Sequence, residues 1–201
     1  MTRVKICGLT MPEEALVCRQ AGADYLGLVF AGGPRLVDVA TARAIRDAVP
    51  EARLVGVFMD QEADEVAEIA AECGLDFLQL HGSESEEDVR DVAARTGLPV
   101  IKALRADGTP SAAADFVLFD LPKSGGAPDE RPRLWARARE AVEAGYRVFL
   151  AGKLIAEDVR AAVAAAAPFA LDVSSGVESS PGRKDAALVR GFMEEIRHAR
   201  A

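Results

Sequence analysis

Eight short apolar runs alternate with longer helical patterns along the chain, and this alternation constrains the fold more than any other feature. The runs are rich in β-branched and other apolar residues, as strands are. The pattern predicts strands over Val4–Cys7, Tyr25–Phe30, Leu54–Phe58, Phe77–His81, Pro99–Ala103, Phe116–Asp120, Arg147–Ala151 and Ala170–Ser174. It predicts helices over Pro12–Ala21, Val39–Val49, Ala63–Cys73, Glu86–Thr96, a weak segment at Pro110–Ala114, Leu134–Ala144, Ala156–Ala166 and Ala186–Ala199.

Strands that alternate with helices form βαβ units and therefore a parallel sheet. Eight such units in 201 residues predict a single α/β domain over residues 1–201, a (β/α)₈ TIM barrel with helices outside a closed parallel sheet. A doubly wound open sheet is the alternative. No G-x-G-x-x-G motif follows the first strand, which disfavours that alternative.

Charge and composition exclude several classes of function. The chain has 32 acidic and 24 basic residues, and its net charge of −8 opposes sequence-independent binding to nucleic acid or to an anionic membrane. No apolar run approaches the roughly 18 residues of a membrane span, and the N-terminus lacks a signal-peptide pattern, so we expect a cytoplasmic protein. Three widely spaced cysteines and two histidines indicate neither a disulfide framework nor a metal centre.

Polar residues within the predicted strands share one face of the sheet. Successive strand side chains point to opposite faces, so Lys5 and Cys7 lie opposite Val4 and Ile6. In a barrel the apolar face packs against the helices, and the polar face lines the axis. The residues expected there are Lys5, Cys7, Gln79, His81, Asp120, Asp172 and Ser174. Most of them stand at the C-terminal ends of strands, where TIM barrels have their active sites.

Closure of a barrel makes the first and eighth strands neighbours. We therefore expect Lys5 and Asp172 to form an ion pair, because charges buried along the axis are costly unless they are paired. Two interpretations of this pair stay open. It can be purely structural, or the cation beneath Cys7 can favour the thiolate of that residue.

Three motifs at the ends of predicted strands carry the most information about function. They are Val4-Lys-Ile-Cys-Gly-Leu-Thr10, Leu78-Gln-Leu-His-Gly82, and Asp172-Val-Ser-Ser-Gly-Val-Glu178 followed by Pro181-Gly-Arg-Lys-Asp185. In sequence, order and spacing they resemble the first, fourth and eighth strands of the phosphoribosylanthranilate isomerase family of tryptophan biosynthesis. The resemblance spans nearly the whole chain. Its first and third motifs are specific together, whereas Q-L-H-G alone would be weak.

The resemblance implies an Amadori rearrangement of N-(5-phosphoribosyl)anthranilate to 1-(2-carboxyphenylamino)-1-deoxyribulose 5-phosphate. A general acid protonates the furanose ring oxygen, and a general base then removes the C2 proton of the resulting Schiff base. Cys7 matches the family's catalytic cysteine, the base, and Asp120 matches its aspartate after the sixth strand, the acid. A free thiol is only slightly ionised at neutral pH, so its surroundings must activate it. The reaction implied needs no cofactor and no metal.

The implied substrate carries two anionic groups. Phosphates in such barrels bind at the loops after the seventh and eighth strands, which here contain Gly152, Lys153, Ser174, Ser175 and Gly176. Arg35 aligns with a family arginine that contacts the anthranilate carboxylate, and a guanidinium suits that group. A solvated loop arginine is the alternative. The remaining expected substrate-binding residues are Lys5, Gln79, His81 and Asp172. The resemblance implies a monomer or a homodimer.

The chain departs from the family's pattern in three loops. Gly152-Lys-Leu154 replaces the usual G-G-L, so Lys153 is strained if its φ is positive, and otherwise adds a cation to the phosphate site. Gly125-Gly-Ala-Pro128 replaces a loop richer in glycine, and Ala31–Pro34 is shorter than usual. These departures keep two alternatives open: an enzyme that acts on another ribosyl phosphate, and a non-catalytic barrel that binds a phosphorylated ligand. Retention of Cys7 and Asp120 disfavours the second.

Overall fold

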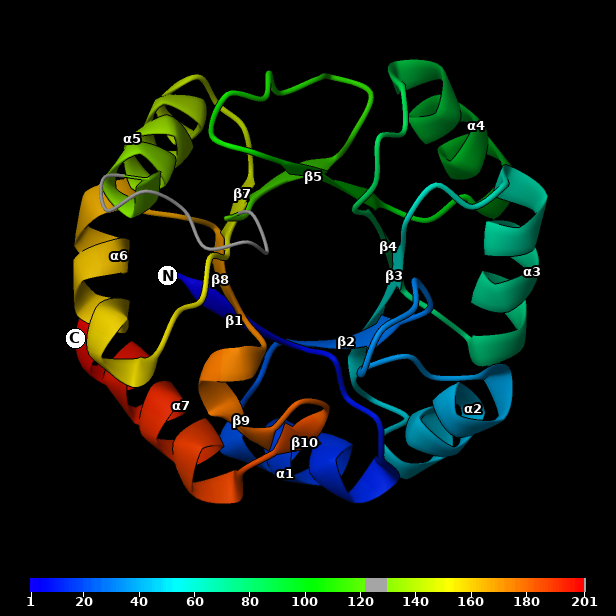
Figure 1. Ribbon diagram of the computed structural model, residues 1–201, viewed down its shortest axis with the longest axis horizontal. Helices are drawn as coiled ribbons and strands as arrows, with labels where there is room; N and C mark the ends of the chain where they lie inside the picture. Colours follow the sequence, from blue (N-terminus) through cyan, green and yellow to red (C-terminus); the bar gives the residue numbers. More distant parts are fainter. Residues whose placement is uncertain (122–129, 201) are drawn as a thin grey trace.

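A computed structural model of the protein describes residues 1–121 and 130–200. Eight parallel strands close into a barrel in the order of the sequence (Figure 1). Strand β1, Arg3–Cys7, pairs with both β2, Tyr25–Val29, and β8, Ala170–Val173. The predicted TIM barrel is therefore confirmed, and the open-sheet alternative is wrong. The other barrel strands are β3 Arg53–Phe58, β4 Phe77–Leu80, β5 Val100–Leu104, β6 Phe116–Phe119 and β7 Val148–Leu150.

Seven α-helices within the described residues surround the barrel, as Figure 1 shows. They are α1 Pro12–Ala21, α2 Val39–Ala48, α3 Ala63–Cys73, α4 Glu86–Thr96, α5 Glu130–Glu143, α6 Val159–Ala166 and α7 Ala186–Arg200. Two short 3₁₀ helices, η1 Ala156–Asp158 and η2 Ser175–Val177, precede α6 and follow β8, and a small hairpin of β9 Glu178–Ser180 and β10 Arg183–Lys184 comes before α7. None of the described helices has the length and apolar character needed to cross a membrane.

The helix predicted at Pro110–Ala114 is wrong, because turns connect β5 to β6 there. Proline supplies no amide hydrogen, and the hydroxyl of Ser111 accepts a hydrogen bond from the amide of Ala113 at 3.1 Å. Such a local bond competes with the helical pattern. The next predicted helix begins earlier than expected, at Glu130, because Pro132 falls in its first turn, where a missing amide costs little.

The alternation of side chains divides the apolar residues between two cores. Val4 and Ile6 belong to the outer core, which packs between the strands and the helices. Inside the barrel, aromatic rings fill the end where the strands begin: Tyr25 packs edge-on against Phe77 and Phe149 with ring centroids 5.3 and 5.5 Å apart. This aromatic plug closes one end of the axis. The polar residues of the strands consequently gather at the other end.

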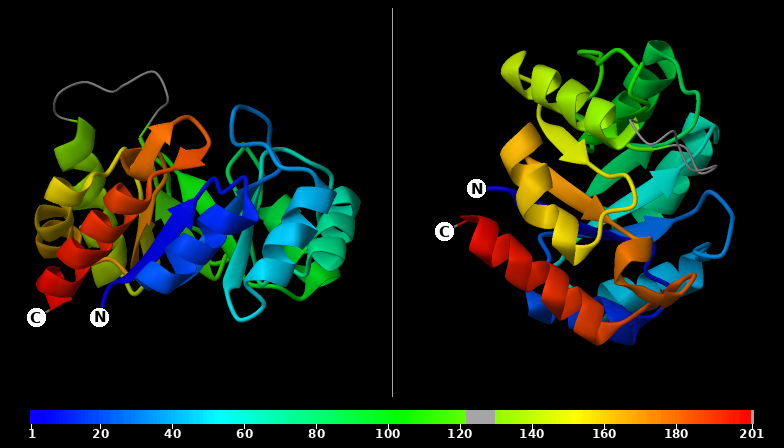
Figure 2. Two further views of the ribbon diagram at one scale, coloured as in Figure 1. Left: turned by 90° about the horizontal axis from the view of Figure 1, so that it is seen from below. Right: turned by 60° about the vertical axis from the view of Figure 1, so that its left-hand side comes forward.

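The two ends of the barrel also differ in their loops. Figure 2 shows both chain termini on one side, and the segment after β2 together with the β9–β10 hairpin on the other. These two parts are in direct contact, since Pro34 lies against Gly182, whose carbonyl also accepts from the hydroxyl of Thr10 in the segment after β1. The C-terminal ends of the strands therefore carry a rim that draws together distant parts of the sequence.

Candidate active site

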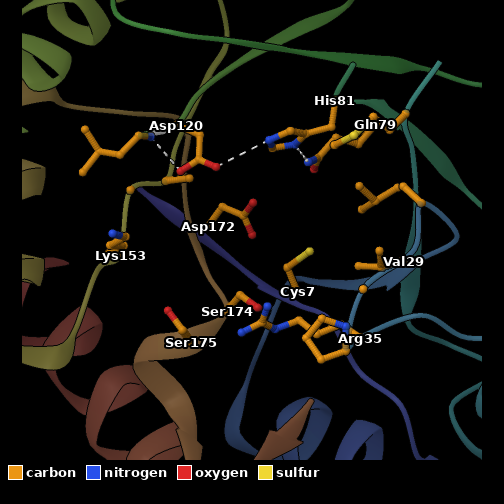
Figure 3. Close-up of a pocket in the computed structure, with 18 of the residues that line it drawn as sticks. Cys7, Val29, Arg35, Gln79, His81, Asp120, Lys153, Asp172, Ser174 and Ser175 are labelled. Atoms are coloured by element: carbon orange, nitrogen blue, oxygen red, sulfur yellow. Dashed lines mark hydrogen bonds and ion pairs between the residues drawn. The ribbon is translucent and has the colours of Figure 1, made fainter. Parts of the chain in front are cut away.

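A cavity of about 330 Å³ opens at the C-terminal ends of the strands. Its volume suits a small-molecule ligand. The polar residues that line it are Cys7, Arg35, Gln79, His81, Asp120, Lys153, Asp172, Ser174 and Ser175, with Gly152 beside them. Figure 3 shows Cys7, Asp120 and His81 pointing into the same space from different strands. The predicted convergence of polar residues at this end of the axis is confirmed.

Lys5 and Asp172 form the expected ion pair below the cavity. They stand opposite each other in the β1–β8 register, and Lys5 Nζ donates to both carboxylate oxygens of Asp172 at 3.0 Å. Lys5 is fully buried, while Asp172 reaches the cavity wall. Burial alone lowers the pKa of Lys5, but the charge of Asp172 and its hydrogen bond raise it above its usual value. The ammonium group therefore stays charged at the floor of the site.

Cys7 ends β1 and places its sulfur in the cavity. The neighbouring strand makes room for it, since a Cβ on Gly27 would lie 2.7 Å from Cys7 Sγ. Burial raises the pKa of the Cys7 thiol above its usual value, Lys5 opposes that shift, and Asp172 adds to it. Lys5 thus acts in the expected direction, but burial outweighs it. The thiol is therefore the favoured form at neutral pH.

Asp120 follows β6 and is held from two sides. Its Oδ1 accepts from the amide of Leu121 at 2.8 Å, and its Oδ2 lies 3.4 Å from His81 Nε2. Gln79 Nε2 donates to His81 Nδ1 at 2.7 Å, so the ring proton of a neutral His81 is on Nε2 and faces Asp120. These contacts link β4 and β6 across the mouth, as the dashed lines in Figure 3 show.

Arg35 reaches the cavity from the segment between β2 and α2. Its Nε and Nη2 donate to the two carboxylate oxygens of Glu178 at 2.8 and 2.6 Å. Lys184 Nζ donates to the same carboxylate at 2.6 Å and to the carbonyl of Ser174 at 3.2 Å. The hydrogen bonds that Arg35 makes to Glu178 raise the pKa of Arg35 above its usual value, although burial alone would lower it. The guanidinium is thus a fixed cation at the cavity wall.

The loops after β7 and β8 form a further part of the wall, and Ser174 lies next to Arg35, since a Cβ on Gly8 would meet both side chains. Gly152 and Lys153 have φ values of 105° and 55°, so Lys153 adopts the left-handed conformation that favours glycine. The conditional prediction of strain at Lys153 is therefore met, and the residue also lines the cavity. Ser174 and Ser175 complete this wall at the start of η2. Glycines and hydroxyls at such a rim suit an anion.

Two residues expected at the site stand outside the cavity lining. Lys5 lies beneath it, behind Asp172. Gly176 packs against the backbone of the β7 loop instead, where a Cβ would fall 1.8 Å from the carbonyl oxygen of Leu154. The absence of a side chain at Gly176 therefore permits η2 to pack closely against the β7 loop. The departure at Gly125-Gly-Ala-Pro128 lies outside the described residues.

Sequence reasoning missed two parts of the site. The first is the carboxylate of Glu178 with its partner Lys184; both residues stand in the quoted motifs, but no role followed from them. The second is the apolar part of the lining, Val29, Val57 and Met59, of which Val29 lies near Arg35 in Figure 3. The position of the two valines near the ends of β2 and β3 was the available signal. Within the described part of the chain, no three His, Cys, Asp or Glu side chains cluster so as to hold a metal ion.

Comparison with known proteins identifies the family. Residues 4–195 match the family model described as N-(5'phosphoribosyl)anthranilate (PRA) isomerase. The N-(5'-phosphoribosyl)anthranilate isomerase of Geobacter sp. (strain M21) is 46% identical over 207 residues, which cover 98% of each chain. That of Rubrobacter xylanophilus is 40% identical over 96% of this chain and 98% of its own length.

Solved structures agree with this result. The phosphoribosyl anthranilate isomerase of Thermus thermophilus superposes with a TM-score of 0.85 at 38% identity, over 98% of this chain and 99% of its own. A phosphoribosyl anthranilate isomerase solved in complex with reduced 1-(o-carboxyphenylamino)-1-deoxyribulose 5-phosphate gives 0.82 at 32% identity, over 98% and 100%. Family model, relatives and structures all cover nearly the full chain. This protein therefore belongs to the N-(5'-phosphoribosyl)anthranilate isomerase family.

Proposed function

We propose that this protein converts N-(5-phosphoribosyl)anthranilate to 1-(2-carboxyphenylamino)-1-deoxyribulose 5-phosphate, with Asp120 as general acid and Cys7 as general base. The observation that carries the assignment is that both side chains line one cavity of about 330 Å³ in a chain of this family. They come from β1 and from the end of β6, on different sides of the barrel. A ribose held between them would meet both groups.

The first step opens the furanose ring. Asp120 protonates the ring oxygen, the bond between that oxygen and C1 breaks, and the nitrogen lone pair forms the Schiff base. The amide of Leu121 and the Nε2–H of His81 fix the carboxyl group in position. A positioned acid contributes about 10²–10⁴-fold to such a step. Gln79 supports it by fixing the orientation and tautomer of His81.

The second step removes the C2 proton. Cys7 takes it as a thiolate, and the electrons of the C–H bond form an enolamine while the iminium nitrogen is neutralised. The enolamine then tautomerises to the ketone product. Lys5 favours the thiolate, because its ammonium lowers the pKa of Cys7 against the opposing effect of burial. The same ammonium is held in place by Asp172.

The cavity offers different groups to the two anionic parts of the substrate. Gly152, Lys153, Ser174 and Ser175 offer backbone amides, hydroxyls and an ammonium group to the phosphate. Arg35, from the segment between β2 and α2, offers a guanidinium to the anthranilate carboxylate. The apolar part of the lining, with Val29 near Arg35, gives the aromatic ring a surface. The different positions of the phosphate-binding groups and of Arg35 set the direction in which the substrate lies.

The proposal is tested by following the loss of phosphoribosylanthranilate with the purified protein beside Cys7→Ala and Asp120→Asn. Turnover by the wild type and its loss in both variants supports the assignment. Thermal unfolding of each variant controls for misfolding. If the wild type binds a phosphosugar analogue without turnover, the barrel is a binding protein, and if only another ribosyl phosphate reacts, the substrate assignment is wrong.

A further inference from the structure

Arg35 lies over the end of β1, between the segment after β2 and the β9–β10 hairpin. Its side chain passes directly over Gly8, where a Cβ would lie 2.3 Å from Arg35 Cδ, and Gly8 itself has φ 78°. The far end of the side chain meets Glu178, 143 positions along the sequence. The backbones of these segments also touch, because a Cβ on Gly182 would fall 2.6 Å from the carbonyl oxygen of Pro34. The arginine is therefore fixed at both ends.

Glu178 is built into the protein more firmly than a surface carboxylate. Its side chain is 4% exposed, and that of Lys184 is 1% exposed. Burial alone raises the pKa of Glu178, but the hydrogen bonds from Arg35 and Lys184 lower it below its usual value. The carboxylate is consequently ionised. Two cations share it, so this buried group retains one surplus positive charge.

The surplus charge faces the cavity. Glu178 occupies the Nε and Nη2 edge of the guanidinium, and among the described residues no acceptor contacts Nη1. Arg35 lines the cavity and is 27% exposed, whereas Glu178 and Lys184 lie behind it. A ligand carboxylate on the exposed edge would complete an alternating row of ammonium, carboxylate, guanidinium and carboxylate. Alternation of this kind satisfies buried charges that single pairs leave unbalanced.

We infer that Glu178, together with Lys184, is a positioning residue that sets selectivity for substrates bearing a carboxylate on the aromatic ring. Glu178 holds the guanidinium in one orientation, and Lys184 keeps the group positive, so the free edge of Arg35 is presented to the ligand. This inference rests on the proposed contact between Arg35 and the anthranilate carboxylate. It adds that the β9–β10 hairpin, and not the β2 segment alone, decides how well that contact forms.

The test compares two substrates that differ only in that carboxylate: phosphoribosylanthranilate and its aniline counterpart, made from aniline and ribose 5-phosphate. The measured quantity is the ratio of their kcat/KM values in one preparation, because the amount of folded enzyme cancels from it. Glu178→Gln should lower the ratio about ten-fold, as expected for a weakened charge-assisted contact, mostly through a higher KM for the anthranilate substrate with kcat little changed. Lys184→Met should lower it in the same direction and serves if Glu178→Gln does not fold.

Glu84→Gln is the matched control. Glu84 is also a buried rim carboxylate, 6% exposed, and it accepts from Lys102 Nζ at 2.6 Å, away from Arg35. Its substitution should destabilise the protein without changing the ratio. A ratio that is unchanged in both Glu178→Gln and Lys184→Met, or that changes equally in Glu84→Gln, overturns the inference.

Arg35→Met distinguishes a failure of this inference from a failure of the proposed contact on which it rests. A fall in the ratio supports the contact between Arg35 and the carboxylate. If Arg35→Met lowers the ratio while both hairpin variants leave it unchanged, the positioning role alone is wrong. If Arg35→Met itself leaves the ratio unchanged, the carboxylate binds elsewhere, and both the proposed contact and the inference fail.

Discussion

Replacing Lys153 with glycine should stabilise the protein and weaken its binding of substrate at the same time. Lys153 has φ 55°, a conformation that costs a residue with a Cβ roughly 1–2 kcal/mol. Glycine removes this cost but loses roughly 0.5–1 kcal/mol through its greater freedom in the unfolded chain. The net gain is roughly 0–1.5 kcal/mol, and its midpoint of about 0.8 kcal/mol corresponds to a rise in Tm of roughly 2–3 °C for a chain of this length.

The same substitution removes a cation from the phosphate end of the cavity. A monovalent pair about 4 Å apart in a water-like medium is worth roughly 1 kcal/mol, the figure suited to an exposed lysine. That energy corresponds to a KM roughly five-fold higher, with kcat little changed because the ammonium would contact the phosphate and not the reacting atoms. Stability and affinity should therefore move in opposite directions in one variant.

Two further variants separate the backbone from the charge. Lys153→Met removes the ammonium and keeps the Cβ, so it should raise KM as much as Lys153→Gly and leave Tm unchanged. Ala167→Gly relieves a similar conformation, φ 46°, between α6 and β8. It should raise Tm without affecting KM. The assays are thermal unfolding by circular dichroism and initial rates over a range of substrate concentrations.

Two results would refute this reasoning. A fall in Tm for Lys153→Gly, with a rise for Ala167→Gly, would mean that contacts of the lysine outweigh its backbone strain. An unchanged KM in both Lys153 variants would mean that its ammonium does not contact the phosphate. In the second case the anion would be held by the backbone amides and hydroxyls of the two loops alone.

Three other perturbations test the catalytic assignment. Burial raises the pKa of Cys7, so kcat/KM should increase with pH into the alkaline range. Asp172→Asn removes a negative charge that also raises the pKa of Cys7, so it should move the midpoint of the pH profile to lower pH. A shift of the midpoint to higher pH would contradict the assignment. Iodoacetamide should alkylate Cys7 first and abolish activity, because Cys7 lines the cavity whereas Cys18 and Cys73 are buried; peptide mapping that finds Cys18 or Cys73 modified first would exclude this order. Gly27→Ala should reduce kcat at least about ten-fold, since a methyl group 2.7 Å from Cys7 Sγ must displace the base, and an unchanged kcat would show that the thiol has room to move.

The barrel could be predicted from the sequence because its determinants are local and repeated. Each strand has its own apolar run, and each α-helix of the outer layer has apolar residues at its own helical spacing. One wrongly predicted element therefore does not affect the others. The failed helix at Pro110–Ala114 illustrates this independence: β5 and β6 still pair directly, and the barrel closes without it. Where the local signal was short and began with a proline, side-chain hydrogen bonds decided the conformation instead.

Part of the site followed from the same local logic. Alternation alone placed Lys5 and Cys7 on the inner face, and closure alone made Asp172 the partner of Lys5. Neither step needed the conformation of a loop. The direction of the Cys7 pKa was less accessible, because it depends on how completely neighbouring strands enclose the sulfur. A sequence can give the charges around a group, but not the balance between those charges and burial.

The charge cluster behind Arg35 could not be found this way, and the reason is physical. Its carboxylate becomes relevant only when a loop after β2 and a hairpin after β8 meet, and tertiary contacts set the position of each. In the sequence, Glu178 and Lys184 read as ordinary charges near the end of a motif. In the structure they are buried behind a guanidinium that alone reaches the cavity. The residues that meet the substrate are thus open to sequence reasoning, whereas those that orient them depend on long-range closure of the barrel rim.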